Sequence, residues 1–101
     1  MTQIRIPMNA WSRQQLRKRT KTCTTRTKKY GSIGDTFKVG FQEYVITDIH
    51  KTILHDVAGH FWKAEGANSE EDFINIWSRI HFINKFNPAQ FVWIHFFEEC
   101  I

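Results

Sequence analysis

The stretch Lys21-Thr22-Cys23-Thr24-Thr25-Arg26 places two cations and three hydroxyl groups within six residues. Threonine is β-branched and suits extended backbone, so residues 22–27 are expected to form a strand. Side chains alternate along a strand, which puts Thr24 and Arg26 on one face and Lys21, Cys23 and Thr25 on the other. A bend near Lys21 would let both sets converge. A cluster of this composition is suited to an anion or a polar planar ligand.

Upstream of this stretch, residues 4–6 alternate and stop at Pro7, which predicts a short first strand. Asn9 is placed to cap a helix over residues 10–19. Downstream, Gly31 and Gly34 bracket a turn. Two strands follow, one over residues 37–41 and one over 44–54, with the connection near residues 42–43.

The second half of the chain predicts two helices and a last strand. Asp56 is placed to cap a helix over residues 56–64. Ser69 and Asp72 form a capping box, and the helix that they open has a buried stripe: Phe73, Ile76, Trp77 and Ile80. Asn87-Pro88 interrupts the chain before residues 91–97, which are apolar on both faces and so predict a central strand.

Length and composition indicate one folded domain over residues 1–101. The chain is 42% hydrophobic and 15% aromatic, and it has no apolar run near the roughly 18 to 20 residues that a membrane span needs. No signal-peptide segment is visible, and Cys23 and Cys100 are too few for a disulfide framework. We expect a soluble, cytoplasmic protein with free thiols.

Charge is distributed unevenly along the chain. Residues 1–40 hold ten Lys and Arg against one acid, a balance of +9, whereas residues 41–101 hold four against nine, a balance of −5. The two values sum to the net charge of +4. Nine excess cations in forty residues, mixed with Trp11 and Tyr30, favour a polyanionic partner over a merely solvated surface.

Four separated motifs give the chain a resemblance to the ASCH domain family over roughly residues 4–97. Lys21 and Arg26 stand at the spacing of a Gly-x-Lys-x-x-x-x-Arg pattern that follows a short helix, although Arg19 stands where the family has glycine. A Gly34-Asp35 turn leads into a strand, and Glu65-Gly66 precedes an acidic helix. The last motif is the closing strand over residues 92–96. The resemblance implies an α+β fold, a small PUA-like β-barrel decorated by two to three short helices.

The same resemblance suggests site residues. Some bacterial ASCH members hydrolyse the acetyl amide of an acetylated cytidine nucleoside with a Lys, a Thr and a Glu that correspond to Lys21, Thr24 and Glu65. A lysine withdrawn into a cleft beside Arg26 would be disfavoured in its charged form and would then serve as a base. Thr24, next to such a lysine, becomes a candidate nucleophile because a hydroxyl needs an adjacent base to be activated.

Other residues have simpler interpretations. His50, His55 and His60 are spaced by five, which does not bring three ligands together, so no metal or other cofactor is expected. Cys23 is interpreted as a small residue packed inward rather than as a reactive thiolate. Most aromatic residues, including Trp62, Trp77 and Trp93, are assigned to packing. Trp11 and Tyr30 lie among the cations and are candidates to stack on a nucleobase.

Two functions remain open from the sequence. In the first, a basic cleft binds RNA, tRNA included, through residues that surround the opening stretch: Arg26, Lys28, Lys29, Tyr30, Arg19 and Trp11. In the second, the same cleft is an amidohydrolase site for a modified nucleoside. Binding is favoured, because the excess positive charge extends well beyond what one nucleoside needs.

Overall fold

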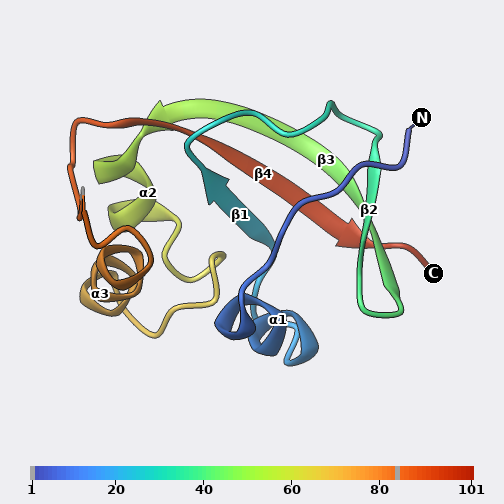
Figure 1. The fold of residues 1–101 in the computed structure, drawn as a ribbon, viewed down its shortest axis with the longest axis horizontal. Coiled ribbons are helices and arrows are strands. Elements are labelled where there is room, and N and C mark those ends of the chain that lie inside the picture. Colours follow the sequence, from blue (N-terminus) through green and yellow to red (C-terminus); the bar gives the residue numbers. More distant parts are fainter. Residues whose placement is uncertain (1, 84) are drawn as a thin grey trace.

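The computed structural model describes residues 2–83 and 85–101. Its four strands are β1 (Cys23–Arg26), β2 (Thr36–Val39), β3 (Gln42–Ile53) and β4 (Phe91–Glu99), and its helices are α1 (Ala10–Arg17), α2 (Leu54–His60) and α3 (Glu70–Ile80). All paired strands are antiparallel, and their order in the sheet is β1-β4-β3-β2. Figure 1 shows this sheet curving over the three helices, with α2 and α3 at one end and α1 near the middle. The predicted α+β class is confirmed, and the sheet forms half of a barrel.

Strand β4 lies inside the sheet and supplies side chains to two hydrophobic cores. Val92 and Ile94 pack with α2 and α3 on one face, whereas Phe97 packs on the other face with Leu16 of α1. Alternation along a strand sends successive residues to opposite faces, so a strand between two cores carries apolar side chains on both faces. The prediction of a central strand is therefore confirmed.

The helix α1 begins as expected and ends earlier than expected. The Asn9 side chain accepts a hydrogen bond from the backbone N–H of Ser12 at 2.8 Å, which is an N-cap. The helix stops at Arg17, and Arg19 adopts a left-handed conformation with φ of 61°. The amides of Arg19 and Thr20 donate to the carbonyls of Leu16 and Gln15, the pattern of a Schellman motif.

Two strand predictions need correction. The strand expected at residues 4–6 is reduced to a parallel bridge between Gln3 and Thr36, next to a hydrogen bond from the Ile4 amide to the Thr36 carbonyl. The hairpin between β2 and β3 turns at residues 40–41 rather than 42–43, since Val39 already pairs with Gln42. Gly40, with φ of 63°, takes the left-handed conformation that this turn requires.

The helix α2 also differs from its prediction, whereas the start of α3 agrees. The helix α2 begins at Leu54, so Asp56 lies within it and accepts a hydrogen bond from the Thr52 hydroxyl instead of capping it. The helix α3 is capped by Ser69, which accepts from the Asp72 amide at 3.0 Å. Phe73, Ile76 and Trp77 are buried as predicted, but Ile80 is 49% exposed. Among the described residues, no helix is both long and apolar enough to cross a membrane.

Candidate functional site

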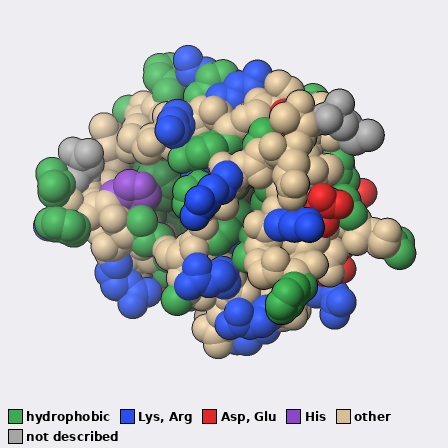
Figure 2. Space-filling view, turned by 45° about the vertical axis from the view of Figure 1, so that its right-hand side comes forward, with side chains coloured by type: hydrophobic (Ala, Val, Ile, Leu, Met, Phe, Trp, Pro, Cys, Tyr) green, Lys and Arg blue, Asp and Glu red, His purple; other side chains and the backbone are tan. Residues whose placement is uncertain are grey.

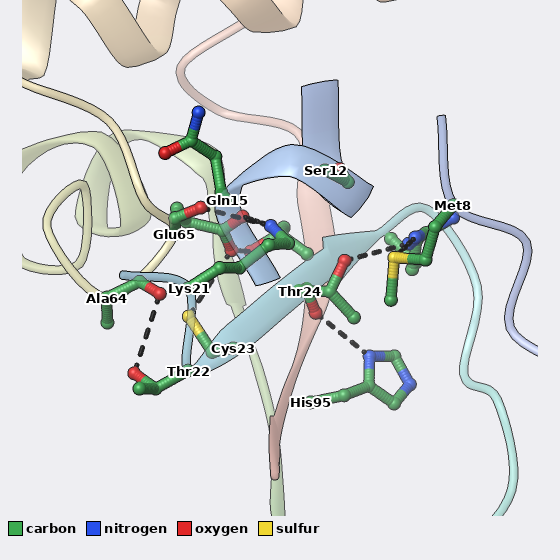
Figure 3. Close-up of polar contacts among 12 residues, drawn as sticks. Met8, Ser12, Gln15, Lys21, Thr22, Cys23, Thr24, Ala64, Glu65 and His95 are labelled. Carbon is green, nitrogen blue, oxygen red and sulfur yellow. Dashed lines mark hydrogen bonds and ion pairs between the residues drawn. The ribbon is translucent and has the colours of Figure 1, made fainter. Parts of the chain in front are cut away.

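A buried ion pair joins Lys21 to Glu65, two residues that are 44 positions apart in the sequence. The Lys21 Nζ lies 3.0 Å from Oε1 of Glu65 and 3.1 Å from the Glu65 backbone carbonyl oxygen. The two side chains are only 2% and 5% exposed. Figure 3 shows both pointing into the space between α1 and the start of β1. Lys21 and Glu65, two of the three predicted catalytic residues, therefore contact each other directly.

Backbone hydrogen bonds explain why Glu65 lies beside Lys21. The amides of Thr22 and Cys23 both donate to the carbonyl of Ala64, at 2.7 and 3.2 Å, and so tie the start of β1 to the turn after α2. Gly66 completes this turn with φ of 96°. A Cβ atom at Gly66 would lie 3.0 Å from Cβ of Gln15 in α1 and 3.3 Å from Cβ of Lys21, so glycine suits both the backbone conformation and the close packing here.

The second carboxylate oxygen of Glu65 accepts two further hydrogen bonds from β1. The Thr25 hydroxyl donates to Oε2 at 2.5 Å, and the Cys23 Sγ lies 3.4 Å from the same atom. Burial, together with the neighbouring Glu65 carboxylate, raises the pKa of the Cys23 thiol well above its usual value. Cys23 is 0% exposed, which confirms the interpretation that it packs inward as a neutral thiol.

Thr24 and Arg26 lie on the opposite face of β1, as alternation predicts. The Arg26 Nε donates to the Thr24 hydroxyl at 3.1 Å, and its Nη2 lies 3.1 Å from the Met8 sulfur. Burial lowers the pKa of the Arg26 guanidinium, because the charged form loses hydration. The Thr24 hydroxyl therefore contacts a guanidinium, while the hydroxyl that contacts Glu65 belongs to Thr25.

His95, at the centre of the sheet, connects β1 to Tyr30. The Tyr30 amide donates to Nε2 of His95 at 2.9 Å, so Nε2 is an acceptor, and Nδ1, 3.2 Å from the Thr24 carbonyl oxygen, must carry the proton. His95 is 0% exposed. Burial, with a smaller contribution from the charge of Arg26, lowers the pKa of His95. This neutral tautomer holds Tyr30 in place, and the sequence contains no local signal for it.

The two faces of β1 open into one cavity of about 490 Å³. Because β1 is an edge strand, its two rows of side chains can line the same space. The polar wall consists of Lys21, Thr24, Thr25, Arg26 and Glu65, the aromatic residues Trp11 and Tyr30 also line the cavity, and α3 contributes an apolar wall that includes Ile76 and Trp77. Figure 2 shows a hollow with hydrophobic side chains at its floor and Lys and Arg side chains around it. Side chains from both faces of the stretch Lys21 to Arg26 therefore meet in one cavity, as expected from the sequence.

The remaining predicted binding residues differ in their position relative to this cavity. Lys28 and Lys29 are exposed, and the Lys28 Nζ lies 5.0 Å from the centre of the Tyr30 ring. The Lys21 Nζ lies 5.5 Å from the centre of the Trp11 ring. Arg19 does not line the cavity, and its Nε lies 3.2 Å from Glu99 at the end of β4. In the described part of the chain, no three His, Cys, Asp or Glu residues form a cluster suited to a metal ion.

Two solved structures share this arrangement of strands and helices. One is an ASCH domain from Lactobacillus crispatus JV V101, which superposes with a TM-score of 0.62 at 13% sequence identity, covering 97% of this chain and 78% of that one. The chain has an ASCH-type fold. The other is the hypothetical protein PH0355, with a TM-score of 0.71 at 11% identity, covering 99% of this chain and 100% of that one. No protein-family model matches the sequence. No curated protein matches it either.

Within this ASCH-type fold, two candidate functional residues, Thr25 and His95, were not predicted from the sequence. Thr25 was a member of the opening stretch but received no role, although its hydroxyl is the one that reaches Glu65. Strand alternation predicted that Thr25 shares a face with Lys21, and this was the available signal. His95 gave no such signal, because its two partners are backbone groups of distant segments.

Proposed function

We propose that this domain binds RNA and holds one unstacked nucleobase in the cavity beside β1. The observation that supports this function is the set of contacts made by the Arg26 guanidinium. Its guanidinium lines the cavity, and among the described residues its N–H groups donate only to the Thr24 hydroxyl and the Met8 sulfur, while its carbon lies 5.9 Å from the centre of the Tyr30 ring. A guanidinium has five N–H donors, so donors remain for a phosphate or a base carbonyl.

The size and lining of the cavity are consistent with a nucleobase. A volume of about 490 Å³ falls within the usual range for small-molecule pockets. Tyr30 and Trp11 offer aromatic rings, and proteins that recognise single-stranded RNA stack splayed bases on such rings. The polar groups of Thr24, Thr25 and Glu65 would then meet the edge of the base.

Positive charge at the edge of the cavity would bind the RNA backbone. Lys28 and Lys29 are exposed and lie just after β1, within residues 1–40, which carry a balance of +9. Phosphate contacts of this kind supply affinity without sequence preference and release counterions. Binding is therefore expected to weaken steeply as salt concentration rises.

The test is fluorescence anisotropy of a labelled single-stranded oligoribonucleotide, titrated with protein at several salt concentrations. The slope of log affinity against log salt reports about 0.7 per phosphate contact on a single strand. Lys28→Glu is expected to weaken binding and to reduce this slope, whereas Arg26→Gln is expected to weaken binding at every salt concentration.

The control for Lys28→Glu is Lys38→Glu, which makes the same charge change on β2, the strand at the opposite edge of the sheet. The control variant is expected to bind like the wild type. Equal losses in both variants would show that only net charge matters. No association at low salt with either single-stranded or structured RNA would contradict the proposed function.

A second function, hydrolysis of an acetylated nucleoside, is favoured by one specific observation. The buried Lys21–Glu65 pair lies in the wall of a cavity that three threonines, Thr24, Thr25 and Thr27, also line. In this function Lys21 first passes one ammonium proton to the Glu65 carboxylate, and its neutral amine can then accept a proton. The Thr24 oxygen attacks the acetyl carbonyl carbon while Lys21 takes the hydroxyl proton, and that proton moves on to the departing cytidine nitrogen. Water then cleaves the acetyl ester of Thr24 and releases acetate. Glu65 would hold Lys21 in position, and Arg26 would stabilise the oxyanion.

This second function is tested by chromatography of cytidine released from acetylated cytidine. Lys21→Ala and Thr24→Ala are each expected to abolish release, and the double variant should be no worse than either. Comparison of Thr24→Ala with Thr25→Ala identifies the reacting hydroxyl, because Thr25→Ala removes the hydroxyl that donates to Glu65 and leaves that of Thr24 in place. Lys28→Glu should leave the rate on a free nucleoside unchanged while weakening RNA binding. No product above the Lys21→Ala background would exclude the hydrolase.

A further inference from the structure

Beyond the cavity, aromatic side chains continue along the same face of the sheet. Trp93 and Phe91 lie on β4, on the face that also carries Arg26. Phe91 is 65% exposed, and Trp93 is half-buried. The interpretation of Trp93 as a packing residue is therefore incomplete, because part of its side chain is accessible to solvent.

Lysine side chains cover these aromatic rings. The Lys51 Nζ lies 5.1 Å from the centre of the Phe91 ring and 5.6 Å from that of Trp93, and the Lys29 Nζ lies 6.0 Å from Trp93. Sheet register explains part of this arrangement. Arg26 pairs with Trp93, and Trp93 pairs with Lys51, so the three form one row across β1, β4 and β3.

In the described part of the chain, these lysines have no acidic partners. The ion pairs within residues 2–83 and 85–101 involve Arg19, Lys21 and His50, and none involves Lys28, Lys29 or Lys51. Their interactions with the rings are weak at exposed sites. The ammonium groups are therefore free to move to an anion, and the ring faces that they leave become available for stacking.

We propose that this surface is a track for single-stranded RNA that leads to the cavity at Tyr30. The track consists of three aromatic residues and three lysines: Tyr30, Trp93, Phe91, Lys28, Lys29 and Lys51. Bases stack on the rings while the lysines contact the intervening phosphates, a combination that single-strand binding proteins use. Tyr30 belongs to both sites, because it lines the cavity and lies beneath Lys28.

Single-stranded RNA fits this surface better than a duplex. Bases in an A-form helix are stacked on one another, so their faces are not available to Trp93 or Phe91. The track rests on the proposed RNA-binding function and extends it, because it predicts how nucleotides outside the cavity are held. The two ideas therefore need tests that fail separately.

Two variants test the track by anisotropy with a labelled uridine oligoribonucleotide of about ten nucleotides. Phe91→Ala is expected to weaken binding at least about fivefold, the lower limit for loss of one stacked base. Lys51→Glu is expected to reduce the salt slope by about 0.7. Both residues are exposed, so the folded state should persist, and circular dichroism checks this.

Matched controls lie in and beside the β2–β3 hairpin. Phe41 is fully exposed at the tip of this hairpin, so Phe41→Ala removes an exposed phenyl ring elsewhere in the protein. Lys38→Glu repeats the charge change of Lys51→Glu. Neither control is expected to alter RNA affinity by more than about twofold. An unlabelled duplex of the same length is expected to displace the labelled oligonucleotide poorly. Polyglutamate, which carries negative charge but no bases, is expected to displace it less well than unlabelled single-stranded RNA does.

Four outcomes separate the proposed function from the proposed track. If the oligonucleotide does not bind the wild type, the proposed function fails, and the track fails with it. If Arg26→Gln weakens binding while Phe91→Ala and Lys51→Glu bind like the wild type, the cavity stands and the track is wrong. The track is also wrong if duplex or polyglutamate displaces the oligonucleotide as well as unlabelled single-stranded RNA does. Losses in the two track variants that are absent in Phe41→Ala and Lys38→Glu, and absent with a single nucleotide as ligand, support it.

Discussion

The Lys21 ammonium lies 3.0 Å from Oε1 of Glu65 in a position from which water is almost completely excluded. The pair joins the start of β1 to the turn after α2, and it forms one wall of the cavity. A buried ion pair contributes little net stability over an apolar pair, but the loss of one partner leaves an uncompensated charge. The pair should therefore matter more for the shape of the cavity than for stability.

This relationship predicts strong coupling between the two residues. Glu65→Met is expected to lower the free energy of unfolding by about 3–5 kcal/mol, because it leaves the Lys21 ammonium without its carboxylate. Adding Lys21→Met should restore much of this loss. Urea denaturation of the two single variants and the double variant measures the coupling.

The exposed pair Arg19–Glu99 provides a control for that cycle. Its side chains are 75% and 35% exposed, so its coupling energy is expected to be no more than about 1 kcal/mol. A coupling for Lys21 and Glu65 as small as this would show that the buried pair does not behave as the structure indicates.

The neutral state of His95 predicts that stability falls in acid. Burial lowers the pKa of His95 in the folded protein, whereas the unfolded chain takes up its proton near pH 6.5. Below that pH the unfolded state binds more protons, so this contribution to stability is complete above about pH 6.5 and is lost as pH falls toward the folded pKa. Urea denaturation at a series of pH values between 7.5 and 5 measures the slope.

The variant His95→Gln isolates this contribution, since an amide can also donate to one backbone group and accept from another. It should be less stable at neutral pH but should have a shallower dependence on pH. The exposed His60 provides the control, because His60→Gln should leave the slope unchanged. An unchanged slope in His95→Gln would mean that His95 is not the responsible group.

The conformation of Arg19 predicts a stabilising substitution. Its φ of 61° costs a residue with a Cβ atom about 1 kcal/mol, and glycine avoids most of this cost. Arg19→Gly is therefore expected to raise the free energy of unfolding by about 1 kcal/mol and Tm by about 4–8 °C. The exposed contact with Glu99 that it loses is worth less.

The neighbouring residue tests the explanation. Lys18 precedes Arg19 and has φ of −78°, so glycine relieves no strain there. Lys18→Gly should lower Tm, and differential scanning calorimetry of the two variants checks the opposite signs. A decrease in both would show that the left-handed conformation at Arg19 carries no such cost.

Local signals in the sequence determined much of the secondary structure and part of the site. The Asn9 and Ser69 caps placed two helix starts, because a cap depends on residues three positions apart. The apolar side chains on both faces of residues 91–97 identified the central strand. Alternation in the opening stretch separated Thr24 and Arg26 from Lys21 and Thr25 before any contact was known.

Contacts between distant segments required the tertiary structure. The Ala64 carbonyl accepts from the amides of Thr22 and Cys23, and this tie helps to bring Glu65 to Lys21 and Thr25. From the sequence Trp93 was assigned to packing, and sheet register placed it between Arg26 and Lys51. Composition and spacing determine which elements form, because caps and alternation act over a few residues. Which side chains contact one another depends on how distant segments pack in the folded chain, and local sequence patterns do not determine that packing.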